Sequence, residues 1–233
     1  FCYDNHMPRR IRATAGGIVY HVLNRGVGRM RLFRKAADFA AMEKVLEDAL
    51  TRTPVRLLAY CLLSNHWHML LWPRADGDLS EFMRWLTLTH TQRWHANRHT
   101  SGTGPIYQGR FKSFPVQSDE HLLTVARYIE RNPLRAGMVE NVEQWQWSSL
   151  WRRCQADAAL REILSDWPVK IPRDWSRWVQ QPQTEAELEA VRRSVQRGRP
   201  FGEDNWARRI AKQFGLESTF RSPGRQPKTA QQP

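Results

Sequence analysis

One apolar stretch, residues 57–72, constrains the fold more than any other part of the chain. The turn-forming pair Ser64-Asn65 interrupts it, so the stretch predicts two adjacent strands. The second strand begins with His66-Trp67-His68. Because side chains alternate between the two faces of a strand, both imidazoles are expected on one face and Trp67 on the other. Two neutral imidazoles on a strand form half of a divalent-metal site, and a chance His-x-His pair is the alternative.

A helix is predicted downstream, with Asp119 as its N-cap. Its apolar stripe is formed by Leu122, Val125, Ala126 and Ile129. Tyr128 and Asn132 are four residues apart and therefore share another side of the helix. Pro133 disfavours helical geometry at Asn132, so the helix ends or kinks there. The alternative is an ordinary interfacial tyrosine followed by a C-terminal asparagine with no chemical role.

The order of predicted elements indicates an α+β fold. A strand over 17–24 and a helix over 37–52 precede the paired strands around the His motif. A long helix over 79–98, a break at 102–105 and a short strand over 110–116 lead to the Tyr128 helix. This βαββαβα order is compatible with a ferredoxin-like βαββαβ sandwich, an antiparallel sheet with helices packed on it.

The chain is long enough for one main domain and a smaller unit. Residues 1–6, which precede Met7, are interpreted as a leader, and 7–150 as the main domain. Residues 151–220 are tryptophan-rich and basic, and short helices are expected there, including one over 206–216 that ends at a glycine. The segment 221–233 is rich in Pro, Gln and Ser and is expected to be disordered.

The charge of the chain points to a polyanionic partner. Its 36 Lys and Arg exceed its 23 Asp and Glu, for a net charge of +13. A basic enzyme of another kind or a ribosome-associated protein is the alternative on charge alone. No phosphate-binding Gly-x4-Gly-Lys-Ser/Thr loop is present, so no nucleotide cofactor is expected. No apolar run suits a membrane span, and the three scattered cysteines suit a reduced, cytoplasmic protein.

Several short motifs occur in one order along residues 7–228: Met7-Pro8-Arg9-Arg10, Tyr20-His21-Val22-Leu23-Asn24-Arg25-Gly26, Ser64-Asn65-His66-Trp67-His68, Gly109-Arg110-Phe111-Lys112-Ser113, Tyr128-Ile129-Glu130-Arg131-Asn132-Pro133-Leu134-Arg135-Ala136-Gly137, Trp147-Ser148-Ser149 and Arg197-Gly198-Arg199-Pro200-Phe201-Gly202. As a set they resemble the REP-associated tyrosine transposases, members of the HUH superfamily of single-strand nucleases. The resemblance implies the same ferredoxin-like fold, with the His strand in the interior of the sheet and Tyr128 facing it.

The resemblance also implies an activity. The chain is expected to be a metal-dependent single-stranded DNA endonuclease and strand transferase that acts on palindromic repeat hairpins through a 5′-phosphotyrosine intermediate. Tyr128 would be the nucleophile, and His66, His68 and Asn132 would bind Mg²⁺ or Mn²⁺; the superfamily often has Gln at the position of Asn132. The protein would be nucleoid-associated and monomeric, with a dimer as the alternative. A second hypothesis is a non-catalytic, regulatory hairpin-binding protein on the same fold.

Further residues are candidates for contact with DNA. Arg110, Lys112 and Arg135 stand near the expected site and would bind phosphates. Tyr107 could stack on a base or simply pack in the core. Arg197 and Arg199 resemble a minor-groove hook, with a basic linker as the alternative. His95 and His99 are spaced as zinc ligands on a helix but lack accompanying ligands, and are interpreted as exposed residues of a basic helix.

Overall fold

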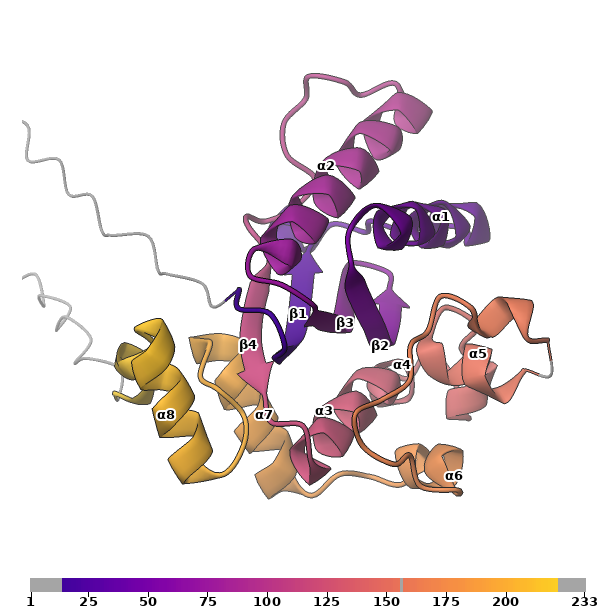
Figure 1. Cartoon of the computed structure of the whole chain (residues 1–233). Helices are drawn as coiled ribbons and strands as arrows, with labels where there is room; N and C mark the ends of the chain where they lie inside the picture. Colours follow the sequence, from indigo (N-terminus) through magenta and orange to yellow (C-terminus); the bar gives the residue numbers. More distant parts are fainter. Residues whose placement is uncertain (1–13, 156, 222–233) are drawn as a thin grey trace, which may run out of the picture.

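The computed structural model describes residues 14–155 and 157–221, and its centre is a four-stranded antiparallel sheet (Figure 1). The strand order is β2-β3-β1-β4. The strands are β1 (Val19–Arg25), β2 (Val55–Leu63), β3 (His66–Pro73) and β4 (Lys112–Val116). With the helices between them, these strands form the predicted ferredoxin-like βαββαβ order. The strand that carries the His pair, β3, lies in the interior of the sheet, as predicted.

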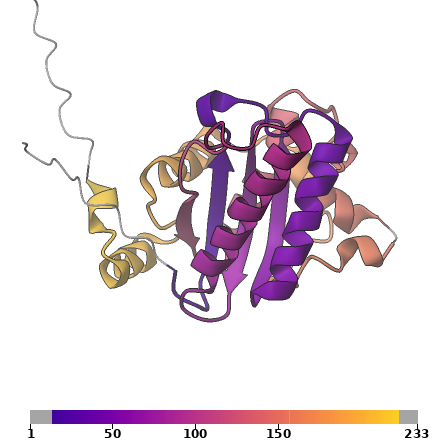
Figure 2. The same cartoon turned by 90° about the horizontal axis from the view of Figure 1, so that it is seen from above.

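The first face of the sheet is covered by two long helices, α1 (Ala36–Arg52) and α2 (Asp78–Arg98), which lie side by side across the strands (Figure 2). Trp67 is fully buried in the apolar cluster between these helices and the sheet. Since the strands are covered on both faces, their sequences are apolar almost throughout rather than alternating. That is why the apolar stretch around residues 57–72 is nearly continuous.

The second face is covered by α3 (Glu120–Glu130), which contacts β2, β3 and β4. Asp119 caps it, because its carboxylate accepts a hydrogen bond from the backbone N–H of His121. The helix ends before Arg131, and a short helix, α4 (Asn132–Arg135), follows directly. The break predicted next to Pro133 is therefore confirmed, and it brings Asn132 to the junction of the two helices.

The C-terminal extension is defined here as residues 157–221. Its helices are α6 (Trp175–Gln180), α7 (Glu185–Arg197) and α8 (Asp204–Phe214), and α5 (Ser149–Cys154) precedes it. In this extension, α6 and α7 lie on the second face and α8 lies beside the edge strand β4 (Figure 1). Short 3-10 helices occur at η1 (Val27–Arg29), η2 (Val142–Gln144), η3 (Ala159–Arg161) and η4 (Glu217–Phe220). The predicted Gly stop is confirmed, because Gly215 ends α8 in the left-handed region with φ +64°.

The C-terminal extension contacts the sheet through one isolated β-bridge. Phe201 forms a parallel bridge with Val116 at the end of β4, and its N–H donates to the carbonyl of Pro115. Gly202 follows in a close approach, since a Cβ there would lie 2.5 Å from Gln117 Oε1. The division at residue 150 stays a prediction, while the leader over 1–6 and the tail over 222–233 lie outside the described residues. In the described part of the chain, no helix is long and apolar enough to cross a membrane.

Candidate active site

The His pair projects from β3 toward α3, as the strand alternation predicted. The rings of His66 and His68 lie 5.1 Å apart, centroid to centroid. Trp67 points to the opposite face, where its Nε1 donates to the hydroxyl of Tyr107. Both imidazoles therefore face one common space between the sheet and α3.

Each imidazole is held by its Nδ1 atom. The Nδ1 of His66 lies 2.6 Å from Asn65 Oδ1, an atom that can only accept, so this nitrogen carries the proton. The Nδ1 of His68 lies 2.8 Å from the Nε2 of His21. In both rings Nε2 is the remaining nitrogen, and it is the atom that can offer a lone pair to a cation.

His21 is the site residue that the sequence analysis did not assign. It lies on β1, it is fully buried, and its own Nδ1 has no hydrogen-bond partner among the described residues. Its ring stacks with that of His68, with an interplanar angle of 8°. A histidine within the apolar run 19–23 was the available signal, but its partner depends on the pairing of β1 with β3, which no local pattern reveals.

Burial keeps these imidazoles neutral. It lowers the pKa of His66 to about 4, with smaller contributions from the charges of Arg25 and Arg135. Burial likewise lowers the pKa of His68 well below the usual value, and that of His21 to about 3. Neutral imidazoles are the form that binds metal ions, so the pair fits a divalent cation at neutral pH.

Tyr128 reaches this space from α3. Its ring meets His68 edge-on at 5.9 Å and His21 at 6.2 Å, centroid to centroid. The side chain is 8% exposed, and the guanidinium of Arg135 lies over its ring at 4.3 Å. The structure thus brings the predicted nucleophile and the predicted ligands together, from elements far apart in the sequence.

Asn132 and Arg135 close one side of the site. The Nδ2 of Asn132 donates to the carbonyl of Tyr128, and its Oδ1 accepts from a terminal nitrogen of Arg135. A carbonyl oxygen has a second lone pair, so Asn132 could still offer a third ligand atom. The other terminal nitrogen of Arg135 is buried and has no partner among the described residues. A buried N–H donor of this kind suits an anionic oxygen.

The remaining predicted residues lie elsewhere. Arg110 and Lys112 are exposed, at the start of the edge strand β4. Tyr107 is buried on the far face of the sheet, and its hydroxyl lies within hydrogen-bond distance of Trp67 and of His90. This buried position agrees with the alternative that Tyr107 packs in the core.

The two arginines of the predicted hook are engaged within the protein. Arg197 donates to the carbonyls of Thr219 and Arg221. Arg199 pairs with Asp204 and lies over the ring of Phe220. Both side chains therefore organise the C-terminal extension and are not brought to the His and Tyr128 site.

His95 and His99 were predicted to be two exposed residues, and this prediction is wrong for His95. His95 is buried, and its two ring nitrogens contact Thr100 Oγ1 and the carbonyl of Gly104, because the chain folds back over the end of α2. His99 ends that helix in the left-handed region. A separate acidic group at the start of α3, Asp119, Glu120 and His121, has the spacing of metal ligands, but His121 Nδ1 is paired with Asp119.

The structure thus places one tyrosine, Tyr128, against the histidine pair on a ferredoxin-like sheet. The sequence model of the family "Transposase IS200 like" matches residues 14–132, more than half of the chain, so the chain belongs to this family. A Haemophilus influenzae protein named as a REP-associated tyrosine transposase is 29% identical over 129 residues, which cover 52% of this chain and 73% of that protein. A solved structure of a REP-associated tyrosine transposase bound to a REP hairpin superposes with a TM-score of 0.53. It is 21% identical and covers 71% of this chain and 94% of that one, a likeness that shows the fold.

Proposed function

We propose that this protein cleaves and rejoins single-stranded DNA at repeat hairpins, with Tyr128 as the nucleophile. The observation that carries the proposal is the meeting of Tyr128, His66 and His68 in one space between α3 and an interior strand. A tyrosine that served only packing would not require two imidazoles with held Nδ1 atoms beside its ring. The related proteins named for REP sequences suggest the hairpin as the substrate.

The reaction exchanges one phosphoester for another. Tyr128 Oη attacks phosphorus, the Oη–P bond forms, and the bond from phosphorus to the 3′ oxygen breaks. The phenolic proton passes through solvent to the released 3′-hydroxyl. Because the 5′-phosphotyrosine is itself a phosphodiester, attack by a 3′-hydroxyl can reverse the step and join strands without external energy.

The chain's own groups prepare the phosphate for this attack. The free N–H of Arg135 would donate to a non-bridging oxygen, while the same side chain holds Asn132 and covers the ring of Tyr128. Arg25 stands opposite His66 in the β1–β3 pairing and adds a second positive charge. These cations offset the negative charge that would repel the nucleophile.

The Nε2 atoms of His66 and His68 would hold a divalent ion, with Asn132 Oδ1 as the third ligand. Mg²⁺ or Mn²⁺ suits such a mixed set of imidazole, amide and phosphate ligands. When bound, the ion supplies Lewis-acid polarisation of the phosphate. His21 would act as a positioning residue, since its acceptance of the Nδ1 proton of His68 leaves His68 Nε2 unprotonated.

A covalent adduct between the protein and labelled DNA tests this proposal. Wild-type chain with Mn²⁺ and a hairpin repeat from the genome that encodes it should form the adduct, and Tyr128→Phe should not, although it still binds the hairpin. Tyr107→Phe is the matched control, because it removes a hydroxyl from the far face of the sheet and should retain the adduct. Hairpin binding without any adduct in the wild type would favour the non-catalytic, regulatory alternative.

A further inference from the structure

The helix that carries Tyr128, α3, is hydrogen-bonded to the C-terminal extension. Its Arg127 and Arg131 donate to the backbone carbonyls of residues 180–182. These carbonyls lie at the end of α6, where a helix leaves its last carbonyls without helical partners. Because Arg127 and Arg131 are about one turn apart, they hold the end of α6 along one side of α3.

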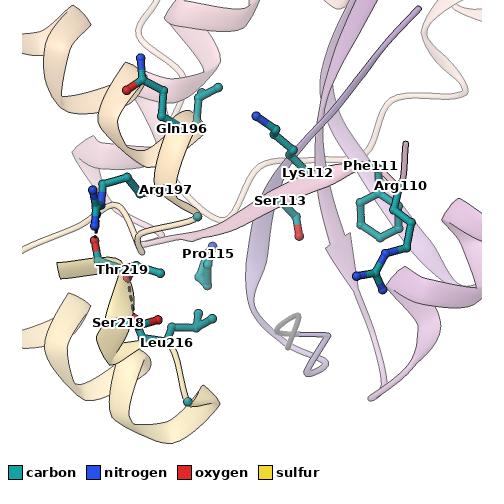
Figure 3. A pocket seen from close by; sticks show the side chains of 13 residues that line it. Arg110, Phe111, Lys112, Ser113, Pro115, Gln196, Arg197, Leu216, Ser218 and Thr219 are labelled. Atoms are coloured by element: carbon teal, nitrogen blue, oxygen red, sulfur yellow. Dashed lines mark hydrogen bonds between the residues drawn. The ribbon is translucent and has the colours of Figure 1, made fainter. Parts of the chain in front are cut away.

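The border between the extension and β4 is more open. The ends of α7 and α8 and the η4 helix face β4 across a cleft of about 360 Å³, with Lys112 on one wall and Ser218 on the other (Figure 3). Arg197, on the second wall, donates to the carbonyls of Thr219 and Arg221, which belong to the extension itself. Beside α3, by contrast, the extension is in direct hydrogen-bonded contact.

Glu130, two residues after Tyr128, lies at the centre of this contact. Its side chain is fully buried. Its Oε1 accepts a hydrogen bond from Ser149 Oγ at 2.5 Å, and its Oε2 accepts one from Trp175 Nε1 at 2.6 Å. Ser149 Oγ in turn accepts from the backbone N–H of Tyr60 on β2. One carboxylate thus joins α3 to β2 through α5, and to α6 through the indole.

The burial of Glu130 makes these two hydrogen bonds important. A carboxylate loses its hydration in the interior, which is unfavourable unless hydrogen bonds and a nearby cation compensate. The bonds from Ser149 and Trp175 and the charge of Arg153 supply that compensation. Hydrogen bonds are directional, whereas apolar contacts are not. They therefore fix one placement of α3 among those that the apolar core would accept.

The placement of α3 decides where Tyr128 points. Two residues of a helix differ by about 200° in direction, so Glu130 and Tyr128 leave α3 on nearly opposite sides. A side-chain atom about 6 Å from the axis moves by about 1 Å when the helix rotates by about 10°. A displacement of about 1 Å can cost about a hundredfold in rate. A helix held at Glu130 cannot rotate freely, and Tyr128 is held with it.

We propose that Glu130 and Trp175 are positioning residues for Tyr128. The indole of the extension fixes the carboxylate of α3, and α3 thereby presents Tyr128 Oη to the phosphate. The inference rests on the proposed function for the reaction that Tyr128 performs. The family match covers residues 14–132, so Glu130 lies within it and Trp175 beyond it. By this inference the C-terminal extension affects the rate of cleavage without contact to the reacting phosphate.

Trp175→Phe tests the inference, because it removes the indole donor and retains an aromatic ring. Trp167→Phe is the matched control. Trp167 is also buried, its ring lies 5.2 Å from that of Trp175, and its Nε1 donates to the carbonyl of Leu58 on β2 instead of to α3. Each variant loses one buried hydrogen bond, so urea denaturation should show similar losses of stability. On a repeat hairpin in Mn²⁺, Trp175→Phe should lower the saturated single-turnover cleavage rate about tenfold with unchanged hairpin affinity, whereas Trp167→Phe should retain the rate.

A second pair of variants separates position from charge. In Glu130→Gln the amide can accept from Trp175 and donate to Ser149, whose hydroxyl also lies 3.2 Å from the carbonyl of Tyr60 and can donate there. This variant should cleave at a rate near that of the wild type, whereas Glu130→Leu should lose at least as much as Trp175→Phe. Equal rates for the wild type and Trp175→Phe would overturn the inference. Equal losses for Trp175→Phe and Trp167→Phe would overturn it as well, because they would reflect general destabilisation.

The position of Tyr128 is also measured without catalysis. Fluorine NMR of the full chain with 3-fluorotyrosine reports it, and Tyr128→Phe assigns the resonance. Trp175→Phe should shift this resonance and Trp167→Phe should not; a resonance that Trp175→Phe leaves unmoved would overturn the inference. If the resonance shifts in a chain that never forms the covalent adduct, the proposed function is lost and the positioning of Tyr128 by Glu130 and Trp175 stands.

Discussion

Replacing His21 with Phe should weaken metal binding while leaving the fold in place. In the proposed site His21 Nε2 accepts the Nδ1 proton of His68 across a 2.8 Å contact, and this acceptance keeps that proton on Nδ1. Without it His68 can place its proton on Nε2, and that form cannot bind a metal ion. Loss of such a partner costs about tenfold to a hundredfold in metal affinity. At about 1.4 kcal/mol per tenfold change, the expected loss is about 1.4 to 2.7 kcal/mol.

The stability of the variant should change little, because two effects oppose each other. The substitution removes the buried Nδ1 of His21 that has no partner, but it leaves the Nδ1 of His68 without one. Each such group costs about 1 to 3 kcal/mol, so the net change should be small. The new ring would lie beside Phe114, which already meets His21 edge-on at 4.8 Å.

Titration calorimetry with Mn²⁺ on wild type, His21→Phe and His21→Gln measures this effect, with thermal melting of the metal-free chains as the control. Gln can place an amide oxygen where His21 Nε2 lies, so it should restore most of the affinity. Equal Mn²⁺ affinity for wild type and His21→Phe would refute the role assigned to His21. If His21→Gln loses as much Mn²⁺ affinity as His21→Phe, packing and not proton placement explains the loss.

Three further predictions concern single positions. Asn132→Gln should retain adduct formation, because the longer amide keeps an oxygen ligand, whereas Asn132→Ala should lower its rate; equal rates for both would exclude a ligand role for the amide. Arg135→Lys should lower the single-turnover cleavage rate at least about tenfold, since an ammonium cannot both hold Asn132 and donate to phosphate as the guanidinium fork does; an unchanged rate would contradict that role. Burial lowers the pKa of His90 to about 4. As the pH falls below about 6.5, the imidazole of His90 is therefore protonated in the unfolded chain before it is protonated in the native state. The native state loses stability as a result, by up to about 3 kcal/mol at about pH 4. Urea denaturation across this range should show that His90→Gln loses this part of the pH dependence, and an identical pH profile would contradict it.

Local pattern was enough to predict the parts of the site that lie on one element. The placement of His66 and His68 on one face follows from strand alternation, and the break near Asn132 follows from Pro133. The register of the sheet could not be predicted from local pattern, because it depends on which strands pair. The contact between His21 and His68 exists only because β1 lies beside β3.

The C-terminal extension was the least predictable part. Its basic residues suggested contact with DNA, but the structure places Arg197 and Arg199 in contacts within the extension. The docking of Phe201 on β4 fixes where these arginines lie, and it depends on an edge strand far away in the sequence. The burial of Tyr107 has the same cause, since its partners Trp67 and His90 come from other elements.

If Tyr128 is the nucleophile, it becomes covalently linked to DNA during the reaction. Mass spectrometry of peptides from wild-type chain, trapped with a cleavable repeat hairpin in Mn²⁺ and digested, tests it most directly. We expect a nucleotide remnant, joined through its 5′ phosphate, on the peptide that contains Tyr128, and none after the same incubation in EDTA. A remnant on any other residue would contradict the role of Tyr128, and an equal yield in EDTA would contradict the metal site.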